Sequence, residues 1–320
     1  MTDREFLTME ISTTVRSFRE PASLRLLRAG HRALSAVARE TAAARAERLF
    51  LTPPRPRRPA WEVGLLAGAE ARPMRVGGRR IETWTWGTGP SVLLVHGWGG
   101  RGTQLGAFIA PLVAHGFSVV TFDAPGHGAA DEGIVTIPEM IEAVHTVAAS
   151  RGRLAGLVAH SAGALTAAHA LHDGVGVDAA VFVGPPTDLY GAAARFTETL
   201  GFSRAVRERM RARIAARVGR PWSAFDVTAL ASTRPAPLLV VHDRGDAEVP
   251  WQQGMAITRA WRGAEMLMTD GLGHRRILRD SDVVAAAVAF VTARTAERGM
   301  AALTARAARE ATPLETLLAG

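Results

Sequence analysis

The stretch Leu154-Ala-Gly-Leu-Val-Ala-His-Ser-Ala-Gly-Ala164 decides the fold class of this chain. Its apolar first half is typical of a buried strand, and the Ala- and Leu-rich sequence that follows is typical of a helix. Ser161 stands where the strand turns into the helix. Such a sharp turn strains the backbone of the turning residue, and the small neighbours Ala159 and Gly163 let strand and helix pack closely. A serine held in this way is exposed as a nucleophile.

The pattern resembles the G-x-S-x-G nucleophile elbow of the α/β-hydrolase superfamily, with Ala159 in place of the first glycine. A serine between small residues also occurs in ordinary helices, so the motif alone leaves a purely structural interpretation open. The superfamily requires an oxyanion loop before the elbow, then an acid, then a histidine. The chain contains candidates for all three in that order.

Two glycine-rich turns precede the elbow. Residues 91–100, Ser-Val-Leu-Leu-Val-His-Gly-Trp-Gly-Gly, resemble the superfamily's H-G-x-x loop. The resemblance implies that the backbone N–H groups of Trp98 and Ala162 form the oxyanion hole. Residues 122–128, Phe-Asp-Ala-Pro-Gly-His-Gly, resemble the D-x-P-G-H-G turn after the fourth strand, in which we interpret Asp123 and His127 as structural.

The acid and the base follow the elbow. The apolar run in Pro237-Leu-Leu-Val-Val-His-Asp-Arg-Gly-Asp-Ala-Glu-Val-Pro250 ends in three carboxylates. The family places its acid a few residues beyond the strand and shortly before a hydrophobic-Pro pair, which favours Asp246 over Asp243 and Glu248. The loop Asp270-Gly-Leu-Gly-His-Arg-Arg276 supplies His274 as the base. An imidazole must take the proton of a weakly nucleophilic serine, and a carboxylate fixes the tautomer of that imidazole.

Composition excludes several other kinds of chemistry. The chain has no cysteine, which rules out a thiol nucleophile and thiolate metal sites. No H-E-x-x-H or similar metal spacing occurs, so we expect neither a metal nor a cofactor. The net charge of +8 comes from arginine alone, which suggests a coding bias, and no aromatic residues interleave with it to stack bases. Nucleic acid is therefore not an expected partner.

The sequence predicts a soluble, cytoplasmic enzyme. Asp3, Arg4, Glu5 and Glu10 interrupt any apolar region of a signal peptide. Two uncharged stretches, 102–122 and 154–172, are long enough to resemble membrane spans, but both contain turns and motifs of a buried sheet. The oligomeric state cannot be predicted.

The predicted fold is the α/β-hydrolase fold, with a mostly parallel central sheet, helices on both faces and a small helical cap after the sixth strand. An antiparallel pair is expected at 74–76 and 80–86, followed by strands at 92–95, 117–122, 154–159, 179–183, 238–242 and 265–269. The predicted parts are a basic helical extension with a Pro-rich linker (1–72), the core (73–184 and 236–295), the cap (185–235) and a C-terminal tail (296–320).

Two arginine-rich helices flank this core. Residues 21–50 read as one long helix with Leu24, Leu27, Leu34, Ala38 and Leu49 near one face. It would pack on the hydrolase domain or a second subunit, or alternatively lie on an anionic membrane surface. In the cap, residues 204–220 carry Val206, Met210, Ile214 and Val218 at intervals of four. This helix is either a solvated lid or a cationic rim that favours substrates with an anionic tail.

The sequence thus predicts a serine hydrolase that cleaves small carboxylic esters through a Ser161 acyl-enzyme. The alternatives on the same fold are a serine peptidase, a thioesterase, an acyltransferase and a catalytically silent binding protein. The peptidase is disfavoured because its group carries H-G-G-P-G where this chain has His-Gly-Trp-Gly-Gly. The silent protein is disfavoured because such relatives usually lose a triad member. Ser161 also argues against dehalogenases and epoxide hydrolases, which carry aspartate at the elbow.

Overall fold

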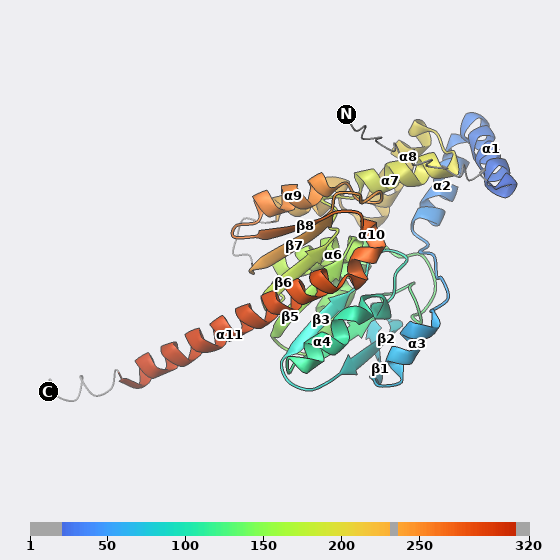
Figure 1. Ribbon diagram of the computed structural model, residues 1–320. Coiled ribbons are helices and arrows are strands. Elements are labelled where there is room, and N and C mark those ends of the chain that lie inside the picture. The colour runs from blue at the N-terminus through green and yellow to red at the C-terminus, as the bar shows by residue number, and fades with distance from the viewer. Residues whose placement is uncertain (1–20, 231–235, 312–320) are drawn as a thin grey trace, which may run out of the picture.

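The computed structural model describes residues 21–230 and 236–311, and a single eight-stranded sheet forms its centre (Figure 1). The strands are β1 (Glu70–Val76), β2 (Arg79–Trp86), β3 (Ser91–Val95), β4 (Ser118–Phe122), β5 (Leu154–His160), β6 (Val177–Val183), β7 (Leu238–Asp243) and β8 (Glu265–Thr269). Their order is β1-β2-β4-β3-β5-β6-β7-β8; in this sheet β2 is antiparallel to both of its neighbours, β1 and β4, and the other neighbouring pairs are parallel. The mostly parallel sheet predicted from the sequence is confirmed.

The central strands are buried along their whole length because both faces of the sheet are covered. Every residue of β5 and β7 is buried. Since β3 to β8 are parallel, their carboxyl ends meet at one edge of the sheet. The loops after β3, β5, β7 and β8, which hold the candidate site residues, therefore converge there.

Helices cover both faces, as predicted. On one face Phe108, Leu112 and Val288 join the core, and on the other Met140, Leu165 and Ile257 do. The first face carries η1 (Gly102–Phe108), α4 (Ile109–Ala114), η4 (Ile277–Arg279) and α11 (Ser281–Ala311). The second carries α5 (Ile137–Ala149), α6 (Ala162–His172) and α9 (Trp251–Ala260). Among the described residues, no helix combines the length and apolar character needed to cross a membrane.

The last helix is longer than the sequence suggested. The sequence predicts a helix over 281–293 and does not distinguish helix from disorder for the residues that follow. In the structure α11 continues to Ala311 and projects beyond the sheet (Figure 1). Residues 312–320 of the predicted tail lie outside the described residues, as do residues 1–20, on which the signal-peptide argument rests.

The predicted helical cap lies between β6 and β7. It consists of α7 (Tyr190–Leu200), α8 (Arg204–Val218), η2 (Trp222–Phe225) and η3 (Val227–Ala229). The apolar stripe of α8 is buried at Val206, Met210 and Ile214. These side chains pack against other helices rather than against the sheet. The cap therefore has an apolar cluster of its own, separate from the two clusters on the faces of the sheet.

The N-terminal extension forms part of this cap. The single helix expected over residues 21–50 is broken at Ala38, whose φ of −144° is not helical, into α1 (Ala22–Val37) and α2 (Arg39–Phe50). The break lets α1 pack on α7 and α2 pack on α8. His31 of α1 forms a 2.8 Å hydrogen bond to the Leu200 carbonyl. Tertiary packing therefore overrides local helix propensity.

The buried face of the extension also differs from the expected one. Leu27 and Leu49 are exposed, whereas α2 buries the small residues Ala42, Ala43 and Ala46. Alanine has no long side chain, so α2 approaches α8 closely at these positions. The third helix of the extension, α3 (Ala60–Leu66), is short and follows the Pro-rich linker.

Most arginines of α8 are paired with acidic residues. Arg213 and Arg217 donate to Glu47 of α2 at 2.7 and 2.8 Å, and Arg209 donates to Glu40. Burial raises the pKa of Glu47, but the hydrogen bonds from Arg217 and Arg213 lower this pKa by a larger amount. The pKa of Glu47 therefore lies below its usual value. These arginines thus hold α2 to the cap.

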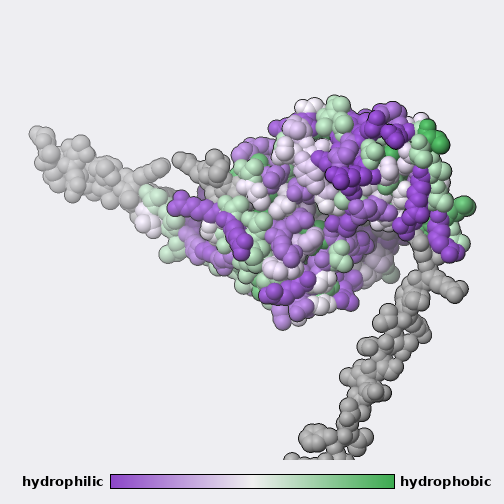
Figure 2. Space-filling model, turned by 90° about the horizontal axis from the view of Figure 1, so that it is seen from above, coloured by the Kyte–Doolittle hydropathy of each residue, from purple (hydrophilic) through white to green (hydrophobic). Residues whose placement is uncertain are grey.

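Hydrophilic residues spread widely over the face of the molecule shown in Figure 2.

Candidate active site

Ser161 occupies a strained turn between β5 and α6. Its φ of 54° and ψ of −128° make it the one non-glycine residue with positive φ among the described residues. Such strain costs roughly 1–3 kcal/mol and persists only where surrounding structure imposes it. Here the Ser161 N–H donates to the Val183 carbonyl at 2.9 Å. The turn predicted from the sequence is therefore present.

The close approach behind this turn depends on glycines. A Cβ at Gly163 would lie 2.4 Å from the His96 carbonyl oxygen, which no side chain can tolerate. A Cβ at Gly97 would lie 2.9 Å from Cβ of Ser161. The loop after β3 therefore contacts the elbow directly, which brings the backbone of Trp98, the residue after Gly97, close to Ser161.

The two amides predicted for the oxyanion hole are free to bind a ligand. Within the part of the chain that the structure describes, neither the Trp98 N–H nor the Ala162 N–H donates to a protein acceptor. Ala162 is the first residue of α6, whose N-terminus carries partial positive charge. Both features suit the binding of a developing oxyanion.

Asp246 and His274 are in direct contact. The Nδ1 atom of His274 lies 2.7 Å from Oδ2 of Asp246, and both side chains are buried. The other oxygen of Asp246 accepts the backbone N–H groups of Glu248 and Val249 at 2.8 Å. Burial raises the pKa of Asp246, but hydrogen bonds from His242 and His274 lower it more, so the carboxyl pKa lies well below its usual range. Asp246 is therefore ionised at neutral pH.

The two other carboxylates of this loop have different partners. Asp243 accepts hydrogen bonds from Gly245 N–H, Thr269 hydroxyl and Leu272 N–H. It therefore braces the loop that leads to His274. Glu248 forms an ion pair with Arg275 at the surface.

Two further histidines contact this pair. The His160 ring lies 4.5 Å from the His274 ring, and its Nε2–H donates to the His274 carbonyl at 2.9 Å. Burial, with the nearby charge of His274, lowers the pKa of His160 to about 3, so it stays neutral. Nε2 of His242 lies 2.9 Å from the Val249 carbonyl and 3.4 Å from Asp246 Oδ2. Both residues therefore support the position of His274 and Asp246.

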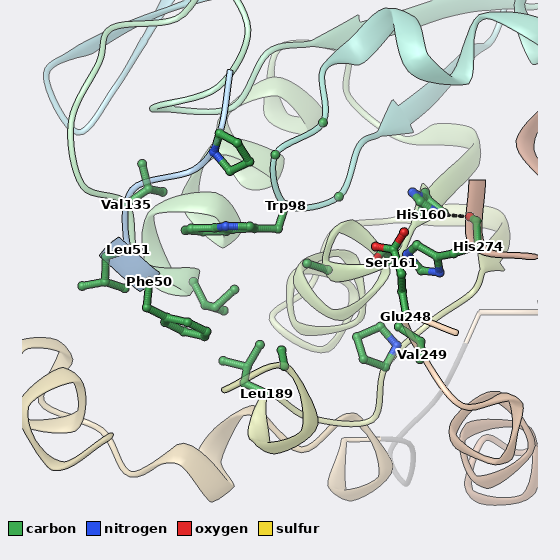
Figure 3. Close-up of a pocket in the computed structure, with 18 of the residues that line it drawn as sticks. Phe50, Leu51, Trp98, Val135, His160, Ser161, Leu189, Glu248, Val249 and His274 are labelled. Atoms are coloured by element: carbon green, nitrogen blue, oxygen red, sulfur yellow. Dashed lines mark hydrogen bonds between the residues drawn. The ribbon is translucent and has the colours of Figure 1, made fainter. Parts of the chain in front are cut away.

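Ser161 and His274 line a common cavity of about 920 Å³. In Figure 3 the cavity runs from Ser161 and His274, past Trp98 and Leu189, to an apolar end formed by Phe50, Leu51 and Val135. From α8 it is lined by Ile214, Ala215 and Val218, while Arg207, Arg211, Arg213 and Arg217 are not among the lining residues. Of the arginines predicted for the cationic rim at residues 204–220, Arg220, which follows the end of α8, lines the cavity.

Residues 92–287 match the model of an alpha/beta hydrolase family, and this segment contains every predicted site residue. The chain belongs to the α/β hydrolase family. No curated protein matches its sequence.

Solved structures share the fold of this α/β hydrolase at low sequence identity. An esterase from Pyrococcus furiosus has 18% identity and a TM-score of 0.60, covering 76% of this chain and 99% of its own. Est1E from Butyrivibrio proteoclasticus, solved with bound ferulic acid, has 17% identity and a TM-score of 0.58, covering 71% and 100%. A thioesterase domain from the curacin biosynthetic pathway has 18% identity and a TM-score of 0.53, covering 70% and 98%.

Sequence reasoning missed the contributions of His242 and of the N-terminal extension to the site of this hydrolase. The sequence places His242 at the end of a predicted strand and no role in the site was predicted for it, although its spacing of four residues from Asp246 is visible. Phe50 and Leu51 carry no motif, and only the folding of α2 onto the cap brings them to the cavity. No local signal could have revealed them.

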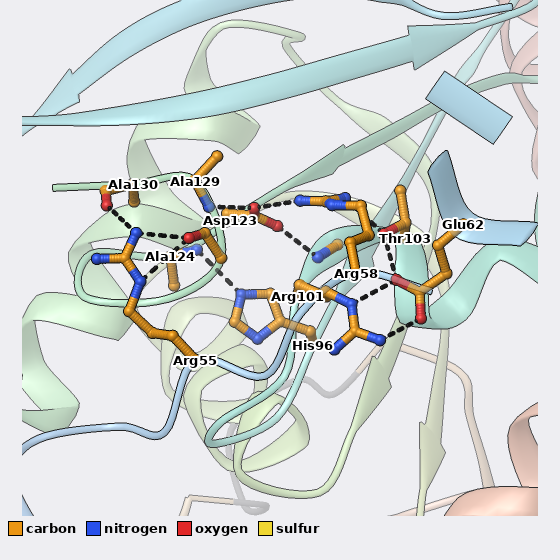
Figure 4. Close-up of polar contacts among 12 residues, drawn as sticks. Arg55, Arg58, Glu62, His96, Arg101, Thr103, Asp123, Ala124, Ala129 and Ala130 are labelled. Carbon is orange, nitrogen blue, oxygen red and sulfur yellow. Dashed lines mark hydrogen bonds and ion pairs between the residues drawn. The ribbon is translucent and has the colours of Figure 1, made fainter. Parts of the chain in front are cut away.

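A buried polar network fixes the linker after α2 to the hydrolase core (Figure 4). Arg58 donates to the carboxylate of Asp123 at 2.6 Å, and Glu62 forms a bidentate ion pair with Arg101. Thr103 donates to Glu62 as well. Asp123 also accepts the N–H groups of Gly102 and Ala129, which agrees with the structural role expected for it.

Glu62→Gln is expected to lower the free energy of unfolding by about 3–5 kcal/mol, because it leaves the buried Arg101 guanidinium without its counter-charge. Glu62 is 1% exposed and Arg101 12%. The matched control is Glu70→Gln, which breaks the exposed pair with Arg72 and is expected to cost about 1 kcal/mol or less. Denaturant titration monitored by circular dichroism measures both. Equal small losses in the two variants would contradict a structural role for the Glu62 pair.

Proposed function

We propose that this α/β hydrolase cleaves carboxylic esters through an acyl-enzyme on Ser161. The observation that carries the proposal is the buried contact of 2.7 Å between His274 and Asp246 at a cavity that also holds the strained Ser161. A nucleophile, a base and an orienting carboxylate in one cavity are the parts that acyl transfer requires.

In the proposed reaction the Ser161 hydroxyl attacks the ester carbonyl while Nε2 of His274 takes its proton. The tetrahedral oxyanion accepts hydrogen bonds from the backbone N–H groups of Trp98 and Ala162. The protonated His274 then gives its proton to the leaving alcohol, which departs and leaves the acyl group on Ser161. Water, deprotonated by His274, hydrolyses the acyl-enzyme and regenerates the serine.

The role of Asp246 in this scheme follows from its contacts. Because its second oxygen is held by two backbone N–H groups, the carboxylate cannot rotate away from His274. It keeps the Nδ1 proton in place, so that Nε2 is free to accept the serine proton, and it stabilises the imidazolium that forms.

Thioester hydrolysis is the second candidate. The apolar arm of the cavity, which runs past Trp98 to Phe50, Leu51 and Val135, offers the same surface to the acyl group of an ester and of a thioester. The distant neighbours include both esterases and a thioesterase, which supports hydrolysis of acyl compounds without separating the two.

A substrate panel tests the proposal. We expect hydrolysis of p-nitrophenyl esters, measured as kcat/KM, with slower cleavage of acyl thioesters and no measurable cleavage of aminoacyl amides. An amine is a poorer leaving group than an alcohol, and the chain lacks the H-G-G-P-G loop of the peptidase group. Faster cleavage of the amide than of the ester would contradict the proposal, and a preference for thioesters would favour the second candidate.

A further inference from the structure

One end of the active-site cavity is built by residues outside the matched family segment. Figure 3 shows Phe50 and Leu51 at the opposite end of the cavity from Ser161, with Trp98 between them. Both come from the end of α2, whereas the family match begins at residue 92. This wall therefore belongs to the N-terminal extension of this chain rather than to the shared fold.

The wall is firmly attached to the hydrolase core. The Leu51 carbonyl accepts the Val135 N–H at 2.7 Å. Four residues further on, Arg55 donates to the carbonyls of Gly128 and Ala130. In between, Pro54 packs on the oxyanion loop so closely that a Cβ at Gly99 would lie 2.7 Å from it. A substrate that reaches this wall therefore meets a fixed surface.

Phe50 joins three parts of the cavity wall. Its ring lies 6.5 Å from the Trp98 ring of the oxyanion loop, 5.1 Å from Phe196 of α7 and 6.0 Å from Trp222 of η2. These ring distances are typical of packed aromatic pairs, which favour fixed relative orientations. Phe50 is thereby held across the apolar end of the cavity.

The chemistry of the site indicates which half of the substrate meets Phe50. The leaving alcohol must receive its proton from His274, so it lies on the side of that residue. In Figure 3 the apolar arm leads away from Ser161 on the other side, along Trp98 to Phe50. The acyl chain therefore has to occupy this arm.

We infer that Phe50, backed by Leu51, forms the end wall of the acyl-binding arm and sets the longest acyl chain that the enzyme accepts. This inference rests on the proposed ester hydrolysis. It identifies the substrates as esters of apolar acyl chains and assigns the N-terminal extension a direct part in selecting them.

The test measures kcat/KM for p-nitrophenyl esters of increasing acyl length. In the parent, kcat/KM is expected to rise about fourfold for each methylene buried, until the chain reaches Phe50. Phe50→Ala opens the wall, so an ester two carbons longer than the best parent substrate is expected to gain about 15-fold over that substrate. Phe50→Trp is expected to shift the optimum to shorter chains.

The matched control is Leu49→Ala, which truncates an apolar neighbour that is 38% exposed and does not line the cavity. Its optimum is expected to remain that of the parent. A second series, with one acyl group and alcohols of increasing length, separates the two halves of the substrate. A shift of the optimum in the alcohol series rather than the acyl series would overturn the assignment of this arm.

A binding measurement keeps this inference separate from the proposed function. Saturated fatty acids of graded length are added to Ser161→Ala protein with Phe50, with Phe50→Ala and with Phe50→Trp, and the melting temperature is recorded. The fatty-acid length that raises the melting temperature most is expected to be longer for Phe50→Ala and shorter for Phe50→Trp than for the protein with Phe50. An unchanged length profile in both variants would overturn the inference even if the enzyme hydrolyses esters. Absence of ester hydrolysis with a shifted profile would instead reject the proposed function alone.

Discussion

Ser161→Ala is expected to lower kcat for ester hydrolysis by a factor of about 10⁶ while the protein remains folded. The loss is this large because the nucleophile and the base act as one unit, so that removal of either abolishes the acyl-enzyme pathway. The substitution itself removes only a hydroxyl, and the side chain of Ser161 donates no hydrogen bond within the described residues. Stability is therefore expected to change little.

Two measurements check this result. Hydrolysis of p-nitrophenyl esters gives kcat, and a fluorophosphonate probe followed by mass spectrometry reports which serine forms a covalent bond. The control is Ser150→Ala, which alters an exposed serine at the end of α5 and should be labelled like the parent. Equal labelling of the parent and of Ser161→Ala would show that another residue is the nucleophile.

Much of the fold could be predicted because its strands are buried on both faces. Continuous apolar runs such as those of β3, β5 and β7 differ clearly from the polar loops between them. The loops at the carboxyl edge follow these runs directly, so their residues could be located from the sequence as soon as the strands were. The structure brings Asp246 into contact with His274 and selects it over Asp243 and Glu248 as the partner of that histidine.

The cap and the extension could not be predicted in the same way, because their arrangement depends on contacts between helices that are distant in sequence. No glycine or proline marks the break at Ala38 in the sequence. The break accompanies the packing of α1 on α7 and of α2 on α8. The arginines of α8 looked like a solvated or substrate-binding surface, yet Glu47 of α2 neutralises two of them. A charge pattern read along one helix does not reveal the partner that another helix supplies.

Asp246→Asn is expected to lower kcat by about 10⁴ with little change in the substrate-binding cavity. Asparagine has nearly the same shape, and its side-chain oxygen can still accept the N–H groups of Glu248 and Val249 at the position of Oδ1. The amide nitrogen would then face His274 in place of Oδ2, and it donates a hydrogen bond instead of accepting one. The imidazole of His274 would then carry its proton on Nε2. A protonated Nε2 cannot accept the proton of the Ser161 hydroxyl.

The matched control is Asp243→Asn, a buried aspartate of the same loop that binds Thr269 and Leu272 rather than His274. Loss of its charge is expected to lower the melting temperature, because a carboxylate with three hydrogen-bond donors is replaced, while kcat changes by less than about tenfold. Comparison of kcat and melting temperature in both variants separates catalysis from stability. If Asp243→Asn loses about 10⁴ in kcat and Asp246→Asn does not, then the carboxylate that orients His274 during the reaction is Asp243, and the contact between Asp246 and His274 is structural only.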